Sequence, residues 1–262
     1  MVGLGVHIGW TKHVSAQAVV AQQAQAAASA VAAKKLAIFK SQTAALQAAN
    51  PLIDVSIAVS SQSFGLQRFG DTGSYSAASI GKLITAAAYL HLVDERKVSL
   101  EQSINGKTAR YWINVMLVNS DDEAWQLLNA QVTHQALSAY GVSIGLTHYD
   151  VSTDSFPAAD AAILLQKLQN GSLLSIVNQK LMLNWLARAN YRAYLVPAVP
   201  SGSQVFHKAG FDGDNLHDAA IIKKGDNSFV LVIFTNGHGN YDWDGRARLI
   251  QEITRDAEAA YL

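Results

Sequence analysis

Three apolar runs near the C-terminus, residues 204–211, 216–224 and 228–235, constrain the fold of this 262-residue chain more than any other feature. Gly-Asp pairs at positions 213–214 and 225–226 separate them. Glycine readily takes the backbone angles of tight hairpin turns, so short apolar runs joined by such pairs are typical of consecutive antiparallel strands. The C-terminal third therefore predicts a three-stranded antiparallel sheet.

A second pair of strands is predicted near the other end of the chain. Residues 53–60 place an apolar side chain at every second position, the pattern of a half-buried strand. These positions are Ile53, Val55, Ile57 and Val59. Residues 64–69 follow after a short polar turn, so a hairpin is expected. Both chain ends would then contribute to one antiparallel sheet of about five strands.

Helices are predicted at both ends of the chain. Residues 15–50 are rich in Ala and Gln, contain no Gly and stop before Pro51, which predicts one long helix or two in series. Residues 15–33 are nearly all small or neutral and are expected to form a stalk. The second part has a stripe that should pack on the fold, consisting of Leu36, Phe39, Ala44 and Leu46. An amphipathic helix is expected over 243–261.

Between the strands, residues 79–185 carry apolar stripes at helical spacing. The predicted class is α+β: an α/β/α sandwich in which terminal helices cover the sheet and an all-helical lobe is inserted, with a cleft between the lobes. The expected organisation is an N-terminal segment and helical stalk at 1–34, followed by one domain at 35–262. Within that domain, the sheet subdomain is 35–75 plus 200–262, and the helical subdomain is 76–199.

Composition excludes several kinds of function. Lys+Arg and Asp+Glu both number 20 and no basic run occurs, so no nucleic-acid partner is expected. The absence of cysteine excludes disulfides, thiolate catalysis and cysteine-based zinc sites. The eight histidines show no metal-binding spacing, so neither a metal nor another cofactor is predicted.

The first ten residues, MVGLGVHIGW, are apolar but too short to span a bilayer, and they lack a basic leader. They fit an ordinary buried segment, and they also fit the trailing end of a membrane anchor. A membrane is therefore expected as a partner only through such an anchor.

The first chemical motif is Ser79-Ile80-Gly81-Lys82, an S-x-x-K at the expected start of a helix. The spacing puts Ser79 and Lys82 on one face. A neutral lysine in a dry site can take the proton of a serine hydroxyl, and backbone N–H groups at a helix start can stabilise an oxyanion. Alone, the motif is equally well explained by an N-capping serine and a surface lysine.

The second motif is Ser120-Asp121-Asp122, inside the helical block. These residue types are favoured helix caps, and alone they would indicate only another helix start.

The third motif is His207-Lys208-Ala209-Gly210, within the first C-terminal strand. Glycine weakens a strand unless something must approach the backbone closely. The alternative is an edge strand with a bulge and a solvent-facing Lys208.

Together, and in this order, the motifs resemble the S-x-x-K, S-D-N and K-T-G signature of class A β-lactamases and penicillin-binding proteins. Residues 156–174 also resemble the helix after the omega loop of class A enzymes. The resemblance covers about residues 36–262 and implies a serine hydrolase acylated by β-lactams or by D-alanyl peptides of peptidoglycan. It also implies an extracytoplasmic location, secreted or membrane-anchored.

The resemblance assigns a role to each motif residue. Ser79 would be the nucleophile, Lys82 its proton acceptor, and Ser120 a relay to the leaving nitrogen. The backbone N–H groups of Ser79 and Phe211 would form the oxyanion hole. The substrate-binding positions would be Asp122, Lys208, Ala209, Gly210 and Phe211.

Three departures from the family pattern bear on turnover. Asp122 stands where an amide normally donates to the substrate, and an ionised carboxylate can only accept. Ala209 replaces a hydroxyl. The segment before Pro157 lacks the glutamate that serves class A enzymes in deacylation, and its only acids are Asp150 and Asp154. Slow deacylation is therefore expected, and the alternative is a catalytically impaired binding or wall-associated protein of the same fold.

Overall fold

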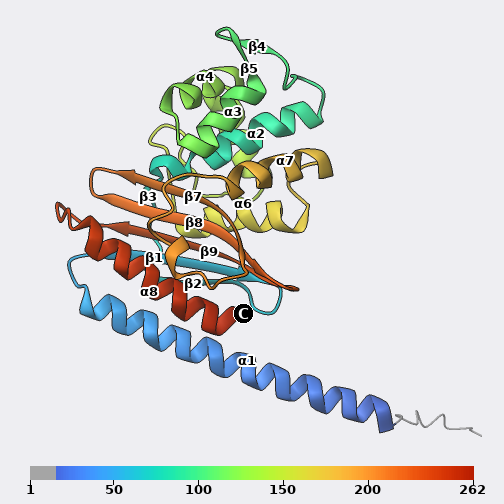
Figure 1. Cartoon of the computed structure of the whole chain (residues 1–262), viewed down its shortest axis with the longest axis vertical. Coiled ribbons are helices and arrows are strands. Elements are labelled where there is room, and N and C mark those ends of the chain that lie inside the picture. The colour runs from blue at the N-terminus through green and yellow to red at the C-terminus, as the bar shows by residue number, and fades with distance from the viewer. Residues whose placement is uncertain (1–15) are drawn as a thin grey trace, which may run out of the picture.

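The computed structural model describes residues 16–262, so the apolar segment 1–10 lies outside the described residues. Five antiparallel strands form one sheet in the order β2-β1-β9-β8-β7 (Figure 1). The strands are β1 Asp54–Ser61, β2 Gly65–Gly70, β7 Gln204–Asp212, β8 Asn215–Lys224 and β9 Asn227–Asn236. The predicted α+β class, with a sheet built from both chain ends, is confirmed.

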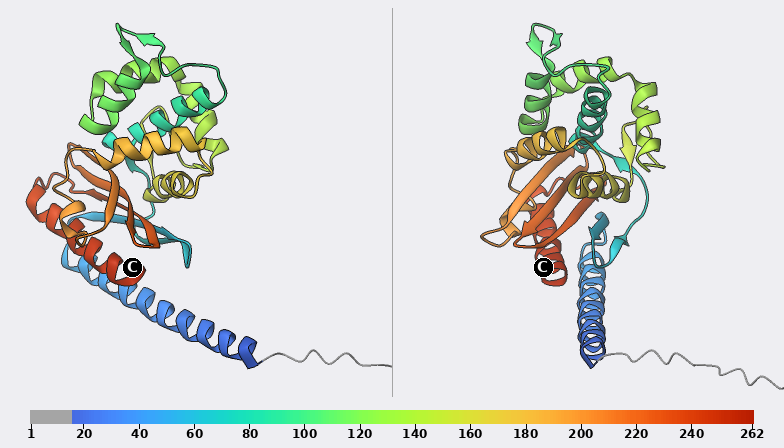
Figure 2. Two further views of the ribbon diagram at one scale, coloured as in Figure 1. Left: turned by 45° about the vertical axis from the view of Figure 1, so that its right-hand side comes forward. Right: turned by 90° about the vertical axis from the view of Figure 1, so that its right-hand side faces the viewer.

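Helices cover both faces of this sheet. Helices α1 (Ala16–Ala49) and α8 (Trp243–Tyr261) lie on one face, and α6 (Ala158–Asn170) lies on the other (Figures 1 and 2). The predicted alternation in β1 is present, since Val55, Ile57 and Val59 all join the core under α1 and α8. The expectation that β1 is only half-buried is wrong, however: its residues 55–60 are all buried, because α6 covers the second face.

The helical lobe follows β2 and returns to the sheet at β7. Its helices are α2 Lys82–Asp94, α3 Ala109–Asn119, α4 Asp122–Val132, α5 His134–Ser143 and α7 Ile176–Ala187. Short segments complete it: β3 Tyr75–Ser76 pairs with β6 Ser155–Phe156, β4 Ser103–Ile104 pairs with β5 Lys107–Thr108, and the 3₁₀ turns are η1 Ala78–Ile80 and η2 Val196–Ala198. Within the predicted helical stretch 79–185, residues 124–137 are divided between the two helices α4 and α5. Thr133 has a positive φ of 71° and caps α5 by accepting from the Ala136 N–H.

The N-terminal helix is continuous, and its second half packs as expected. Phe39 is fully buried, and its ring meets Phe69 edge-on at 4.9 Å. The assignment of Ala44 to this stripe is wrong. Ala44 is exposed and Thr43 is buried instead, because five residues beyond Phe39 the helix has turned about 140° away from the buried face.

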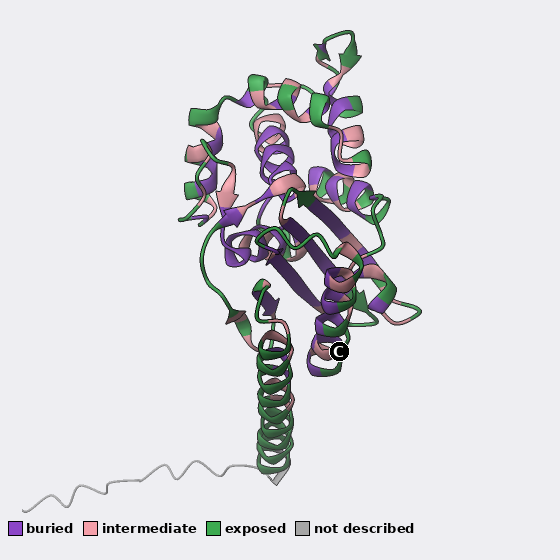
Figure 3. Ribbon diagram, turned by 90° about the vertical axis from the view of Figure 1, so that its left-hand side faces the viewer, coloured by how far each residue is buried: buried purple, intermediate pink, exposed green. Residues whose placement is uncertain are grey.

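The first half of α1 extends away from the domain, and residues 18–31 are all exposed (Figure 3). Among residues 16–262 there is no helix that combines the length and apolar character needed to cross a bilayer. The stalk boundary at residue 34 and the other domain limits stay predictions.

Two truncations should separate the stalk from the packed part of α1. Deleting residues 1–33 should change the melting temperature little, because the exposed side chains bury scant apolar surface. Deleting residues 1–50 removes Phe39, and losing a buried Phe costs about 3–5 kcal/mol, or roughly 10 °C for a chain of this size. Thermal unfolding followed by circular dichroism would measure both, and equal melting temperatures would contradict the division.

Candidate active site

Ser79 lies where the sheet meets the helical lobe, in the 3₁₀ turn η1 immediately before α2. The segment before Ser79 is held to the strands β7 and β8 by hydrogen bonds of Ser76. The Ser76 hydroxyl donates to Asp212 at 2.9 Å, and the Ser76 carbonyl oxygen lies 2.9 Å from His217 Nε2. No side-chain capping bond is described for η1 or α2. Ser79 therefore does not cap either of these two helices through its side chain.

Lys82 is the first residue of α2, and its side chain is buried. Its Nζ donates to Ser79 Oγ at 2.8 Å, to the Ser120 carbonyl oxygen at 2.8 Å and to Asp122 Oδ1 at 2.5 Å. The Trp125 ring lies 5.9 Å from Nζ, within reach of a cation–π contact. The Ser120 carbonyl oxygen, Asp122 and the Trp125 ring thus hold the Lys82 amino group beside Ser79.

Ser120 links two lysines. It sits between α3 and α4 with a left-handed backbone, φ 61°, and its Oγ accepts from Lys208 Nζ at 2.8 Å and lies 3.4 Å from Lys82 Nζ. Its neighbour Asp121 does cap α4, by accepting from the Ala124 N–H at 2.8 Å. The Ser120-Asp121-Asp122 motif therefore both caps α4 and contributes side chains to the cluster around Ser79.

Lys208 enters the cluster from the opposite lobe, on the edge strand β7. It is buried rather than solvent-facing, and its Nζ also donates to the Ala209 carbonyl oxygen at 2.8 Å. Burial, together with the nearby Lys82 charge, lowers the pKa of Lys208 to about 7. Near neutral pH the protonated and neutral forms of Lys208 are therefore both well populated.

Gly210 explains how β7 can lie against η1. A Cβ at this position would come within 3.1 Å of the backbone nitrogens of Ser79 and Ile80. Its absence allows the backbones to approach closely and puts the following residue, Phe211, beside the nucleophile turn. Phe211 is exposed, and its ring packs edge-on against Tyr191 with the ring centroids 5.2 Å apart.

Asp122 contacts the cluster from the solvent side. Its side chain is 79% exposed, yet it forms the ion pair with buried Lys82. A carboxylate that accepts from Lys82 cannot donate to a substrate carbonyl as an amide would.

The two acids of the loop before Pro157 have different surroundings. Asp150 is exposed and accepts from the backbone N–H and hydroxyl of Ser152 at 2.8 and 2.6 Å, which lowers its pKa. Asp154 lies against Gly81 of the S-x-x-K motif, and burial raises its pKa to about 6. Both acids can be identified from the sequence, but their different surroundings cannot. The contact between Asp154 and Gly81 joins segments about 70 residues apart.

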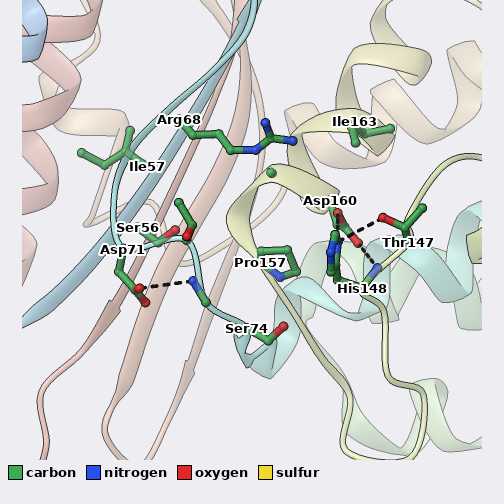
Figure 4. Close-up of a pocket in the computed structure, with 13 residues that line it drawn as sticks. Ser56, Ile57, Arg68, Asp71, Ser74, Thr147, His148, Pro157, Asp160 and Ile163 are labelled. Carbon is green, nitrogen blue, oxygen red and sulfur yellow. Dashed lines mark hydrogen bonds and ion pairs between the residues drawn. The ribbon is translucent and has the colours of Figure 1, made fainter.

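A separate cavity of about 400 Å³ is lined by residues of β1, β2 and the start of α6 (Figure 4). Its lining includes Arg68, His148 and Asp160 but none of the motif residues. Buried Asp160 accepts from the His148 N–H at 3.0 Å and so anchors the loop. Within residues 16–262, no group of three or more His, Asp or Glu side chains is arranged to hold a metal ion.

An antiparallel sheet with an inserted helical lobe, and an S-x-x-K serine where they meet, defines the class of β-lactamase-fold serine hydrolases. The chain belongs to the beta-lactamase enzyme family, whose model matches residues 39–261. A comparison with curated protein sequences finds no match.

Solved structures share the fold. An ancestral class A β-lactamase superposes with a TM-score of 0.78 at 23% identity, covering 85% of this chain and 100% of that one. The structure of PBP-A superposes with a TM-score of 0.77 at 18% identity, covering 85% of this chain and 95% of that one. A β-lactamase from Xanthomonas campestris superposes with a TM-score of 0.75 at 19% identity, covering 84% of this chain and 96% of that one.

Proposed function

We propose that this protein is a serine hydrolase acylated on Ser79 by β-lactams or D-alanyl peptides, and that it loses the acyl group slowly. The observation that carries the proposal is the 2.8 Å contact between Lys82 Nζ and Ser79 Oγ, in a cluster that Ser120 joins to Lys208. Nucleophile and base within hydrogen-bond reach, with the base itself held by further groups, is the arrangement that covalent catalysis requires.

Acylation would use these contacts in sequence. Neutral Lys82 takes the Ser79 proton as Oγ attacks the carbonyl carbon, and the backbone N–H groups of Ser79 and Phe211 stabilise the oxyanion. The proton then passes through Ser120, whose Oγ lies 3.4 Å from Lys82 Nζ, to the leaving nitrogen. Lys208, in its protonated form, would attract the substrate carboxylate.

The same cluster supports slow turnover. Asp122 and Ala209 each remove a polar contact that the family pattern gives to the substrate. The loop before Pro157 offers only aspartates for activating water, a step that contributes about 10²–10⁴-fold. We further propose an extracytoplasmic location, since peptidoglycan peptides are found there.

Intact mass measured over time after mixing with penicillin tests both steps. The expected result is one added penicillin mass that persists, together with weak steady-state hydrolysis of a chromogenic cephalosporin. Absence of the adduct would refute the proposed acylation, whereas fast multiple-turnover hydrolysis would refute slow deacylation.

One observation favours a second candidate, a catalytically impaired binding or wall-associated protein. The Asp122 carboxylate holds Lys82 in an ion pair at 2.5 Å, and an ammonium engaged in this way cannot take the Ser79 proton. A fluorescent penicillin separates the candidates, because the impaired protein would bind it without a covalent bond that survives denaturation.

A further inference from the structure

We infer that Asp122 determines the substrate specificity of this site: its carboxylate binds a protonated amine that the substrate carries close to the scissile carbonyl. This role rests on the proposed function and narrows its substrate class. The preferred substrates are zwitterions, with a carboxylate on the leaving group and an ammonium on the acyl group, as in a D-alanyl peptide with a free amine.

The polar side chains of the site form one series of contacts. Lys208 Nζ donates to Ser120 Oγ at 2.8 Å, and this hydroxyl lies 3.4 Å from Lys82 Nζ. Lys82 Nζ in turn donates to Asp122 Oδ1 at 2.5 Å. Ser79 Oγ joins the series at Lys82, at 2.8 Å. The series therefore has a lysine at one end and a carboxylate at the other, and the nucleophile contacts it between the two.

Asp122 has a free acceptor on the solvent side of the site. Its side chain is 79% exposed, whereas that of Lys82 is 2% exposed. Lys82 engages Oδ1, and no hydrogen bond or ion pair joins Oδ2 to another side chain within residues 16–262. The carboxylate is two successive hydrogen bonds from Ser79 Oγ, so a short substituent beside the reacting carbonyl can reach it. An ionised carboxylate only accepts, and a charged donor gives it the stronger bond.

Acylation itself creates a need for a cation at Asp122. Lys82 can take the Ser79 proton only after it has released its own ammonium proton to solvent. The neutral amine no longer balances the carboxylate, whereas a substrate ammonium beside Oδ2 does, because opposite charges within about 4–6 Å stabilise each other. A substrate amine therefore takes over the ion pair that Lys82 gives up, and a substrate carboxylate at the same place would be repelled.

Lys208 provides the opposite charge at the other end of the series. It is 2% exposed, and below its pKa of about 7 it is mainly an ammonium. A substrate carboxylate at Lys208 and a substrate ammonium at Asp122 would each meet an opposite charge. A zwitterion that places both groups therefore fits the site better than an anion that carries only the carboxylate.

Three penicillins that differ at one carbon of the acyl group test this specificity. Benzylpenicillin has a hydrogen at that carbon, ampicillin an amine and carbenicillin a carboxylate, and all three share the ring nucleus and the neighbouring phenyl group. The second-order rate constant for adduct formation would be measured by intact mass at about pH 6.5, where an α-amino group is mainly protonated.

In the wild type we expect ampicillin to acylate Ser79 about fivefold faster than benzylpenicillin, the upper end of what an exposed ion pair contributes. Carbenicillin should be the slowest of the three. Asp122→Asn keeps the shape of the side chain and removes its charge, so the ratio of the ampicillin rate to the benzylpenicillin rate should fall to about one. Because the ratio compares two substrates of the same protein, any general effect of the substitution on Lys82 cancels.

Glu123→Gln is the matched control, because Glu123 is an exposed acid in the same first turn of α4 and, in the described part of the chain, is not paired with Lys82. Both variants remove one acid from the start of the helix, but Glu123→Gln should keep the wild-type ratio. An equal ratio in wild type and Asp122→Asn, or an equal fall in Glu123→Gln, would overturn only the role of Asp122. A wild type that forms an adduct with none of the three penicillins would refute the proposed function itself.

Discussion

Ser79→Ala is expected to abolish covalent labelling by penicillin completely, because the variant has no hydroxyl to form the ester. The fold should persist. The hydroxyl makes one described contact to a buried group, the 2.8 Å bond from Lys82, and Lys82 keeps the Ser120 carbonyl oxygen and Asp122 as acceptors. Losing one such hydrogen bond costs about 1 kcal/mol. Intact mass and thermal unfolding of the same preparation would test both expectations.

A serine elsewhere on the surface gives the matched control for labelling. Ser152 is exposed and lies in the loop before Pro157, so Ser152→Ala should be acylated like wild type. A penicillin mass on Ser79→Ala would show that another residue is the nucleophile.

Lys82→Met is expected to slow acylation by about 10²–10⁴-fold, the contribution typical of a positioned base. Methionine nearly preserves the volume of the buried side chain while removing the proton acceptor and the charge. Asp122 is not left as a buried charge, because its side chain is 79% exposed. The melting temperature should therefore change by only a few degrees.

The rate constant for adduct formation, measured at several penicillin concentrations, distinguishes a catalytic from a structural role. A base that acts in the reaction predicts a lower maximal rate with a nearly normal melting temperature. A large drop in melting temperature with unchanged acylation of the folded fraction would show that Lys82 only supports the fold.

Local periodicity was sufficient to predict most of the secondary structure. The strands β7, β8 and β9 end within one residue of the apolar runs that predicted them, and helix α8 coincides with its predicted range. Each residue turns a helix by about 100°, so an error of one position moves a side chain off the buried face. The predicted stripe therefore includes Ala44, which is exposed, in place of Thr43, which is buried. Burial of both faces of β1 could not be predicted, because the covering helix α6 lies about 100 residues further along the chain.

The fold class, the family resemblance and the order of the three motifs can all be read from residue types at short spacing along the chain. Which side chains come into contact depends instead on how distant segments pack. This packing brings Lys208 to Ser120 across the two lobes at 2.8 Å, pairs Asp122 with Lys82, and presses Asp154 against Gly81. Such contacts join residues 40 to almost 90 positions apart, and their geometry follows from how the sheet and the helical lobe pack together.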